Sequence, residues 1–367
     1  MNENMFGYYH EEYYDNGTIK FEGQFKSNKA NGYGKSYYDN GNIQYEGNWN
    51  NGTYDGDGTL YDKNGSIVYS GKWVNGHKST ENRKFVEKTD LYSPKLKEYL
   101  EKLNSLIGLM NVKKELNGLI NFVRLQSLRN KKGLKTPSIS LHMVYTGNPG
   151  TGKTTVARLI SQILFELGYL SKGHLIETNR GGLVAGYLGQ TALKTEEVVK
   201  KAIGGVLFID EAYSLSNDDE YGQEAIDTIL KLMEDYRNNL VVIVAGYPDL
   251  MANFIDSNPG LASRFNRYIE FTDYTKEELL QIFDYICKDN SYEIDSEGKI
   301  ELEKYIVNIL QGKDEKFGNA RTMRNIFEKS IMFQANRIMG MKVIPDDLSI
   351  LTKFDIQRCL QHNRKGV

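Results

Sequence analysis

The sequence predicts an α/β protein with a parallel sheet, preceded by a small all-β repeat module and followed by a helical module. Three observations support this prediction. Short, continuous apolar segments alternate with helical patterns between residues 141 and 271, as in a parallel sheet covered on both faces. Glycine and aromatic residues recur with a 24-residue period before residue 79. After residue 275 only helical patterns are expected.

The composition indicates a chain of several domains. Its 367 residues correspond to about two to three domains of roughly 150 residues each, and 40% of them are hydrophobic, enough for a substantial core. The net charge of −2 argues against a general nucleic-acid-binding surface. Cys287 and Cys359 stand in no metal or redox spacing, so we expect both to be packing residues in a reducing compartment.

The N-terminus has no targeting signal. Residues 1–4 carry neither the basic region nor the apolar core of a signal peptide. No apolar run reaches the roughly 18 residues of a membrane span. We therefore expect a cytoplasmic protein.

The N-terminal module consists of three similar units. Each reads Asn-Gly-x-Ile-x-aromatic-x-Gly-x-aromatic. Asn-Gly is typical of a type I′ turn, and the alternating large residues indicate hairpin strands with the Ile and both aromatic side chains on one face. A single hairpin cannot bury such a face, so we expect stacked hairpins over residues 1–78. The repeated positions are Gly17, Gly41 and Gly65; Gly23, Gly47 and Gly71; Ile19, Ile43 and Ile67; Phe21, Tyr45 and Tyr69; and Phe25, Trp49 and Trp73.

The remaining elements follow from charge and apolar periodicity. Residues 79–93 are rich in charge and indicate a linker, and Pro94 begins a helix over 95–104. A second helix is expected over 112–129, and strands over 141–146, 175–178, 206–211, 241–247 and 268–271. The last helices are expected near 275–289, 296–311, 319–339 and 352–361. The predicted organisation is a linker and helix at 79–105, a large α/β domain at 106–272 and a helical domain at 273–367.

A glycine-rich stretch connects the first strand of the α/β domain to a helix that begins at Thr155. It reads Gly147, Asn148, Pro149, Gly150, Thr151, Gly152, Lys153 and Thr154, which is the pattern of a phosphate-binding loop, or P-loop. The glycines let backbone N–H groups converge on an anion, and the helix N-terminus adds a partial positive charge. Lys153 would then reach the β- and γ-phosphates, and the Thr154 hydroxyl would bind Mg²⁺. The alternative is an ordinary glycine-rich turn.

Two acidic residues end a later apolar strand. Asp210 and Glu211 directly follow the four apolar residues from 206 to 209. Beside a P-loop, Asp210 is expected to support the metal ion, and Glu211 to act as general base or to position the attacking water. A chance acidic helix start is the alternative, since acids favour helix N-termini.

Further motifs follow in order: Leu183–Ala192, Tyr221–Ala225, Asn258–Arg267 and Gly318–Arg321. With the P-loop and the acidic pair, they resemble the AAA+ ATPases, and most closely the subgroup of the red-type rubisco activase and stage V sporulation protein K. The resemblance runs from about residue 106 to 360. It implies an α/β P-loop NTPase fold with a C-terminal helical lid, and a ring, usually a hexamer, that binds ATP and Mg²⁺ between subunits. Residues 8–78 resemble MORN repeats, which bind or scaffold proteins or lipids.

The resemblance also implies roles for three arginines. Arg264 and Arg267 match the arginine fingers that a neighbouring subunit supplies, where a guanidinium neutralises charge on the γ-phosphate. Helix capping, or pairing with surface acids, is the alternative for both. Arg321 matches the lid arginine known as sensor 2, and Arg324 is a second candidate for that role.

Two other sites follow from the same resemblance. Ile107 and Gly108 match the segment that packs on adenine, or else form an ordinary helix-ending turn. Tyr187 matches the aromatic pore-loop residue with which ring translocases grip an extended peptide, with a tyrosine in a packed turn as the alternative. Lys194 is a further candidate for the pore. The glycines that would make this loop mobile are Gly182, Gly186 and Gly189.

One position departs from the family pattern. The strand at 241–247 ends in Ala245, Gly246 and Tyr247, where the family usually has a polar sensor 1 residue, often Asn or Thr. We therefore assign no sensor 1.

The combined motifs predict an ATP-driven remodeller of a client protein, which the repeats recruit. The alternative is an ATP-gated assembly switch or scaffold in a regulatory or defence complex, in which hydrolysis only resets the assembly. A nucleic-acid-handling role is disfavoured because the sequence lacks an aromatic-basic patch. The expected partners are a protein client and further copies of the chain. No membrane partner is expected, although lipid contact by the repeats stays open.

Overall fold

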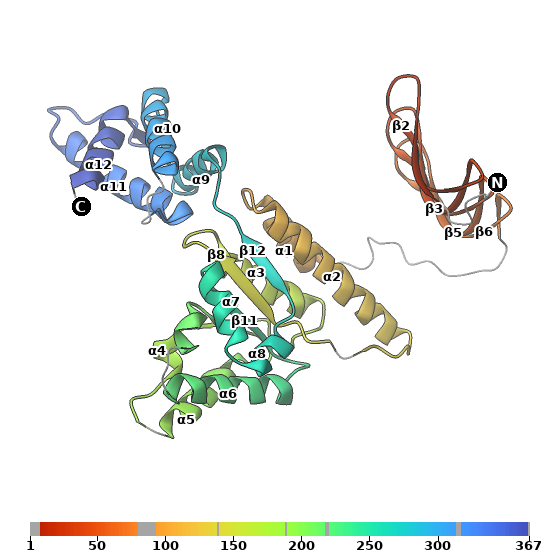
Figure 1. Cartoon of the computed structure of the whole chain (residues 1–367). Helices are drawn as coiled ribbons and strands as arrows, with labels where there is room; N and C mark the ends of the chain where they lie inside the picture. Colours follow the sequence, from red (N-terminus) through yellow and green to blue (C-terminus); the bar gives the residue numbers. More distant parts are fainter. Residues whose placement is uncertain are drawn as a thin grey trace. The chain divides into compact units, whose positions relative to one another are not determined.

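The computed structural model describes residues 8–79, 93–137, 139–187, 189–216, 220–312 and 317–365. The chain divides into two compact units, Met1–Tyr92 and Ser93–Val367, which Figure 1 shows in colours that follow the sequence. Most of the charged segment that was interpreted as a linker, residues 80–92, lies outside the described residues.

The first unit is a single antiparallel sheet in which every strand pairs with the next one along the chain. This confirms the small all-β repeat module that the sequence predicted. Its seven strands are β1 (Tyr8–Tyr13), β2 (Ile19–Lys26), β3 (Lys29–Tyr37), β4 (Ile43–Asn50), β5 (Thr53–Tyr61), β6 (Ile67–Val74) and β7 (His77–Lys78).

The prediction of type I′ turns at Asn16-Gly17 and its equivalents is wrong. Tyr14 N–H donates to the Thr18 carbonyl at 2.8 Å, and Gly17 N–H donates to the Tyr14 carbonyl at 2.9 Å. This pairing leaves three residues in the loop, so only the last one, Gly17, needs a positive φ (81°). The type I′ turns lie at the opposite ends of the strands, as at Asn51-Gly52, where both residues have positive φ (50° and 84°).

Aromatic rings pack along one face of this sheet. This packing explains why glycine recurs at fixed positions in each repeat. Tyr45 is fully buried, and its ring stands edge-on to Trp73 at 5.6 Å. The Trp73 indole donates to the Gly58 carbonyl at 3.1 Å. A Cβ on Gly58 would overlap the Tyr45 hydroxyl, so only glycine allows the ring to lie flat on the neighbouring strand.

The second unit contains a five-stranded parallel sheet, as predicted. Its strands are β8 (Met143–Gly147), β9 (Leu175–Thr178), β10 (Val206–Ile209), β11 (Val241–Gly246) and β12 (Tyr268–Phe271), in the order β12-β8-β11-β10-β9. Neighbouring residues of β10 point to opposite faces, yet Val206, Leu207, Phe208 and Ile209 are all at most 1% exposed. Both faces of the sheet are therefore covered at β10, which explains why this strand is wholly apolar.

The helices of the large domain lie around this sheet (Figure 1). The first, α1, packs against α3 and is capped by Ser93, whose hydroxyl also donates to Glu166 at 2.7 Å. Residues 93–105 thus pack with the α/β domain. The helices are α1 (Pro94–Ser105), α2 (Met110–Lys131), α3 (Lys153–Glu166), α4 (Arg180–Leu183), α5 (Gln190–Ala202), the 3₁₀ helix η2 (Ala212–Ser216), α6 (Glu220–Asp235), α7 (Pro248–Asp256) and α8 (Pro259–Arg264).

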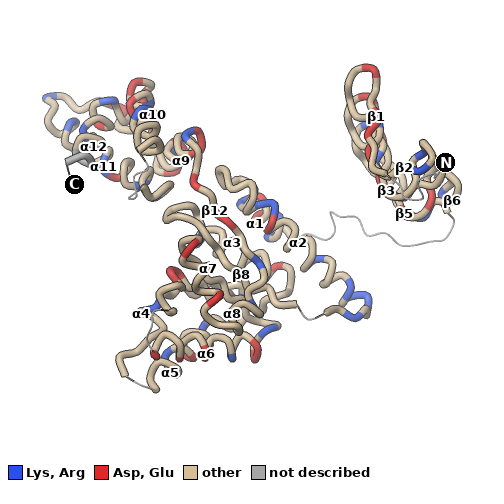
Figure 2. Tube along the Cα trace, viewed as in Figure 1, with Lys and Arg blue, Asp and Glu red and all other residues tan. Residues whose placement is uncertain are grey.

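Charged residues of both signs are interspersed over this unit (Figure 2). Basic residues cluster along the chain at the C-terminal end of α2, which includes Arg129, Lys131 and Lys132. Among the described helices, none has both the length and the apolar character that crossing a bilayer requires.

The C-terminal part is the predicted helical module, with one correction. Its helices are α9 (Lys276–Asp289), α10 (Ser296–Gln311), α11 (Asn319–Met339) and α12 (Lys353–Lys365). The expectation that strands end before residue 275 is wrong, because β13 (Glu293–Ile294) pairs in parallel with β14 (Ile350–Leu351). These short strands precede α10 and α12, and their pairing satisfies backbone groups that the buried Leu351 takes out of water.

Both cysteines are buried, as expected, Cys287 in α9 and Cys359 in α12. Burial raises the pKa of Cys287 to about 12 and also raises the pKa of Cys359. A thiol with a raised pKa is a poor nucleophile and a poor metal ligand. The two residues therefore act as apolar packing groups.

Candidate active site

A cavity of about 570 Å³ lies where the P-loop meets α9 and α11. This volume is within the usual range for small-molecule sites. The cavity combines polar groups from the P-loop and the acidic pair with apolar groups from the α1–α2 connection and α9. The residues that line it are Ser105, Leu106, Ile107, Leu109, Gly147, Pro149, Gly150, Gly152, Lys153, Thr154, Thr155, Asp210, Glu211, Gly246, Tyr247, Tyr274, Ile282, Tyr285, Ile286, Ala320, Arg321 and Arg324.

The P-loop takes a backbone path that requires glycine. Gly147, Gly150 and Gly152 have φ of +146°, +74° and +98°, values that L-residues with a side chain rarely adopt. A Cβ on Gly150 would also overlap the Gly318 carbonyl. Gly152 is the N-cap of α3, and no side chain among the described residues caps that helix. The first N–H groups of α3 are therefore available to an anion, as the sequence predicted.

Lys153 is held against the loop backbone. Its ammonium group donates to the carbonyls of Gly147 and Asn148 at 2.7 and 2.8 Å. Burial lowers the pKa of Lys153; nearby Asp210 acts in the opposite direction, and Arg321 lowers the pKa further. The Lys153 charge is thus close to Asp210 and to Arg321 of the lid.

Asp210 and Glu211 leave the end of β10 and both line the cavity. The Glu211 N–H donates to the Asp210 carboxylate at 3.0 Å, and the Glu211 carbonyl accepts from Ser214 N–H at 2.9 Å. Glu211 has φ of +50°, a conformation that costs free energy for a residue with a side chain and that often occurs at functional sites. The backbone is therefore bent at the residue predicted to be the general base.

The donor set around Thr154 and Asp210 fits a hard cation. A hydroxyl and a carboxylate are the oxygen ligands that Mg²⁺ prefers, and protein Mg²⁺ sites often include substrate phosphates. Among the described residues, no group of three or more His, Cys, Asp or Glu side chains could hold a metal by itself. A metal here would share its ligands between the protein and the phosphates.

The opposite end of the cavity is apolar and is formed by two separate segments. Ile107 and Leu109 come from the α1–α2 connection, and Ile282 and Tyr285 come from α9. Gly108 does not line the cavity; it has φ of +62°, and a Cβ there would overlap the Glu278 carboxylate. The predicted adenine segment thus lies at the cavity through Ile107, while Gly108 allows the connection to pass close to α9.

Asn148 and Thr151 support the P-loop rather than line the cavity. The Asn148 amide donates to both carboxylate oxygens of Asp273, at 3.0 and 2.9 Å. Thr151 is fully buried, and its hydroxyl donates to the Asn148 carbonyl at 2.8 Å. Sequence reasoning did not identify Asp273, because no local motif marks it.

Sequence reasoning also missed Tyr213 and left Tyr247 without a role. Gly246 sits so close to Tyr213 that a Cβ would overlap its ring, and the rings of Tyr213 and Tyr247 are 6.2 Å apart. Burial and the neighbouring Glu211 raise the pKa of Tyr213. At the place of the usual polar sensor 1 residue, the chain therefore has a tyrosine pair beside Glu211.

Comparison with known proteins identifies the family. Residues 143–273 match the ATPase family associated with various cellular activities (AAA), and residues 275–366 match the AAA lid domain. The chain is 46% identical over 268 residues to protein CbbX of Cereibacter sphaeroides, an alignment that covers 71% of this chain and 86% of the relative. The chain belongs to the AAA family of ATPases.

Other relatives confirm the predicted subgroup. The chain is 42% identical over 265 residues to stage V sporulation protein K of Bacillus subtilis, covering 71% of this chain and 82% of the relative. It is 44% identical over 277 residues to the chloroplastic ribulose bisphosphate carboxylase/oxygenase activase of Cyanidioschyzon merolae. That alignment covers 73% of this chain and 93% of the relative. Residues 21–43 and 45–67 match the MORN repeat. The protein is therefore an AAA ATPase with an AAA lid and N-terminal MORN repeats.

Arg264 and Arg267 of this AAA ATPase do not line the cavity of their own chain. Arg264 ends α8 and is half-buried; among the described residues its hydrogen bonds are long, 3.4 Å to the Gly260 carbonyl and 3.5 Å to the Ser263 hydroxyl. The Nε atoms of both arginines are buried without a hydrogen-bond partner among the described residues. Neither arginine is paired with a carboxylate in the part of the chain that the structure describes, so the alternative of pairing with surface acids has no support there.

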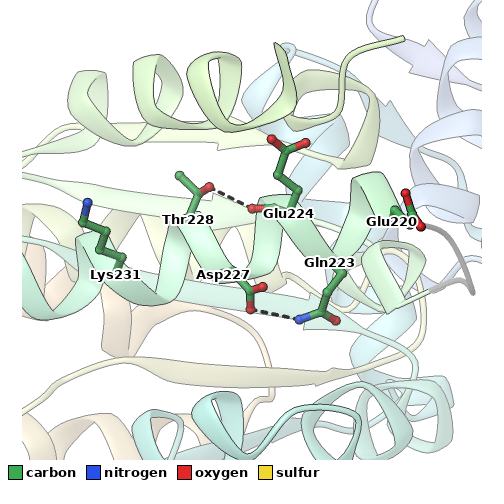
Figure 3. Close-up of a pocket in the computed structure, with 6 residues that line it drawn as sticks. All are labelled: Glu220, Gln223, Glu224, Asp227, Thr228 and Lys231. Atoms are coloured by element: carbon green, nitrogen blue, oxygen red, sulfur yellow. Dashed lines mark hydrogen bonds between the residues drawn. The ribbon is translucent and has the colours of Figure 1, made fainter. Parts of the chain in front are cut away.

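The helix that carries Arg264 is held by α6. Asn258 caps α8 by accepting from Gly260 N–H at 2.7 Å, and its amide lies 3.4 Å from the Asp227 carboxylate. Gln223 also donates to Asp227, at 2.9 Å (Figure 3). The Tyr221–Ala225 motif therefore begins a helix that positions the cap of the arginine helix.

Tyr187 stands in the loop between α4 and α5, with 73% of its surface exposed. The alternative of a tyrosine buried in a packed turn is therefore wrong. Lys194, a candidate for the pore, instead donates to the carbonyls of Gly181 and Val184 at 2.8 and 2.7 Å and braces the base of this loop. The next residue, Leu188, lies outside the described residues.

Proposed function

We propose that this AAA ATPase assembles into a ring, in which ATP turnover remodels a client protein that the MORN repeats recruit. The observation that carries the proposal is the state of Arg264. Its guanidinium does not line the cavity of its own chain, and among the described residues no carboxylate is paired with it. Arg264 is only half-buried, so its guanidinium can present its charge to a phosphate in another subunit.

In the proposed site, Lys153 exchanges the carbonyls of Gly147 and Asn148 for the β- and γ-phosphates of ATP. Mg²⁺, held by the Thr154 hydroxyl and the Asp210 carboxylate, would neutralise phosphate charge. Glu211 orients the attacking water and accepts its proton. Pro149, Gly150, Gly152 and Thr155 shape the phosphate end of the cavity.

The proposed ring completes each site from the neighbouring subunit. Arg264, with Arg267 next to it, would reach the γ-phosphate in the adjoining subunit and stabilise the charge that develops there. Arg321 and Arg324 would approach the same phosphate from the lid of the chain that binds the nucleotide. Hexamers are common in this family, and we propose a six-membered ring.

Tyr187 is proposed to contact the client. It is exposed on a loop whose base is held by Lys194. The Tyr187 side chain can therefore move while the base of the loop stays in place. An aromatic ring grips an extended peptide through its apolar surface and without regard to sequence. The client is expected to differ from that of the activase relatives, because the MORN repeats supply separate recruitment.

The alternative proposal is a switch, in which ATP binding alone drives assembly. Two full-length variants distinguish the remodeller from the switch. Glu211→Gln should bind ATP without turnover, and Tyr187→Ala should hydrolyse ATP without remodelling. If the Glu211→Gln chain supports full biological activity, the switch is correct. If Tyr187→Ala remodels the client that co-purifies with Glu211→Gln, the proposed peptide grip is wrong.

A further inference from the structure

The P-loop and the lid are joined directly through Asn319, the first residue of α11. This side chain is fully buried. Its amide nitrogen donates to Asp273 at 2.8 Å and lies 3.3 Å from the Pro149 carbonyl, and its amide oxygen accepts from Tyr274 N–H at 3.0 Å. One side chain thus binds the P-loop and the segment that connects the large domain to the lid.

Asp273 extends this connection to a second point of the P-loop. Its carboxylate accepts from Asn319 on the lid side and from Asn148 on the P-loop side. The following residue, Tyr274, donates its hydroxyl to the Thr151 carbonyl at 3.2 Å. These residues lie between the end of β12 and the start of α9, so the hinge of the lid is attached to the P-loop.

The backbone of α11 adds a third attachment and leads to Arg321. Ala320 N–H donates to the Gly150 carbonyl at 3.2 Å. Asn319 has φ of +48°, a region that Asn tolerates better than most residues. Arg321 follows two residues later, lines the cavity, and is close enough to Lys153 to lower its pKa.

We propose that Asn319 is the positioning residue that couples the P-loop to the lid and thereby holds Arg321 at the γ-phosphate. A ligand that shifts the backbone at Asn148 or Pro149 must also shift Asp273 and the start of α11, because the hydrogen bonds join them. The lid then adopts one orientation with ATP and another with ADP. This inference rests on the proposed role of Arg321.

The test uses Asn319→Gly in the full-length chain. Glycine keeps the left-handed backbone and removes all three side-chain hydrogen bonds. Kd values for ATP and ADP are measured in the Glu211→Gln background, so that ATP is not consumed. The ratio of the ADP Kd to the ATP Kd should fall about tenfold, the effect of losing one charge-assisted contact to the γ-phosphate. In the Arg321→Ala background, Asn319→Gly should produce no further change in this ratio.

Gln334→Ala is the matched control. Gln334 is another buried amide on α11, and it donates to the Leu348 and Ile350 carbonyls inside the lid. Its loss should destabilise the lid and leave the ratio unchanged. If Asn319→Gly fails to fold, Asp273→Leu replaces it, because that variant removes the oxygens that accept from Asn148 and Asn319; the ratio should again fall.

Three results are decisive. If Asn319→Gly weakens both nucleotides equally, Asn319 has only a structural role and the inference is overturned. If Asn319→Gly and Arg321→Ala reduce the ratio additively, the coupling does not act through Arg321. If Arg321→Ala alone leaves the ratio unchanged, the proposed role of Arg321 fails, independently of the coupling.

Discussion

His142 lies beside the end of the Arg264 helix, with its ring 6.0 Å from that of Phe265, the next residue after Arg264, and the arginine charge acts on the imidazole. His142 is 2% exposed, and its Nδ1 accepts from Val242 N–H at 2.9 Å. Burial, and secondarily Arg264, lower the pKa of His142 to about 4. The imidazole must therefore stay neutral for its Nδ1 to accept from Val242 N–H, at the start of β11.

Acid should destabilise the second unit through His142. The folded-state pKa of about 4 is below the ordinary 6.5, so the unfolded chain binds more protons between these values. The stabilisation is complete above pH 6.5 and is lost as the pH falls to about 4, a total of about 3 kcal/mol. The check is urea unfolding followed by circular dichroism at 222 nm, which reports the helical unit. As the pH is lowered, the free energy of unfolding should fall less steeply in His142→Asn than in the parent chain. If the two proteins lose stability equally with falling pH, His142 is not the group responsible.

Gly150→Ala should uncouple the lid from the P-loop. The added Cβ would overlap the Gly318 carbonyl, and the positive φ adds backbone strain of about 1–3 kcal/mol. ATP affinity, measured with a fluorescent nucleotide, should fall by more than about tenfold. Gly118→Ala is the control, since a Cβ there meets no atom within 4 Å. If both variants bind ATP like the parent chain, the contact between Gly150 and Gly318 does not couple the lid to the P-loop.

Gly58→Ala should damage the repeats and spare the ATPase. The Cβ would overlap the Tyr45 hydroxyl, and overpacking of this kind costs about 1–3 kcal/mol. Both tryptophans, Trp49 and Trp73, lie in the repeats, so tryptophan fluorescence reports the unfolding of this unit alone. ATP hydrolysis should be unchanged and client capture reduced. A parallel loss of hydrolysis would mean that the repeats take part in turnover.

The sequence predicted those features that depend on local pattern. The strands β9 and β12 begin and end at the predicted residues, because short apolar runs flanked by polar residues have few alternatives. The P-loop glycines occur at positive φ, as that motif requires. The turn type at Asn16-Gly17 was not predictable from the dipeptide, since strand pairing at Tyr14 and Thr18 decides the loop length.

The supporting contacts of the site were not predictable, because they join residues far apart in the chain. Asn148 and Asp273 are 125 residues apart in the sequence, and Asn319, which donates to Asp273, lies 46 residues further along. Nothing local distinguishes Asp273 from an ordinary surface acid. Tyr213 and Tyr247 likewise meet only after β10 and β11 have paired.

Mixing two inactive variants tests whether Arg264 completes the site of a neighbouring subunit. Lys153→Ala lacks the phosphate contact, and Arg264→Ala lacks the arginine finger, so each alone should be inactive. In mixed rings, an Arg264→Ala subunit keeps an intact P-loop and can receive Arg264 from a Lys153→Ala neighbour.

The measurement is ATP hydrolysis by an equimolar mixture, with ring formation checked by sedimentation. Random assembly completes about a quarter of the head-to-tail interfaces, so about a quarter of the parent rate per subunit should return. If mixed rings form and hydrolyse no more ATP than either variant alone, Arg264 does not act on the neighbouring site.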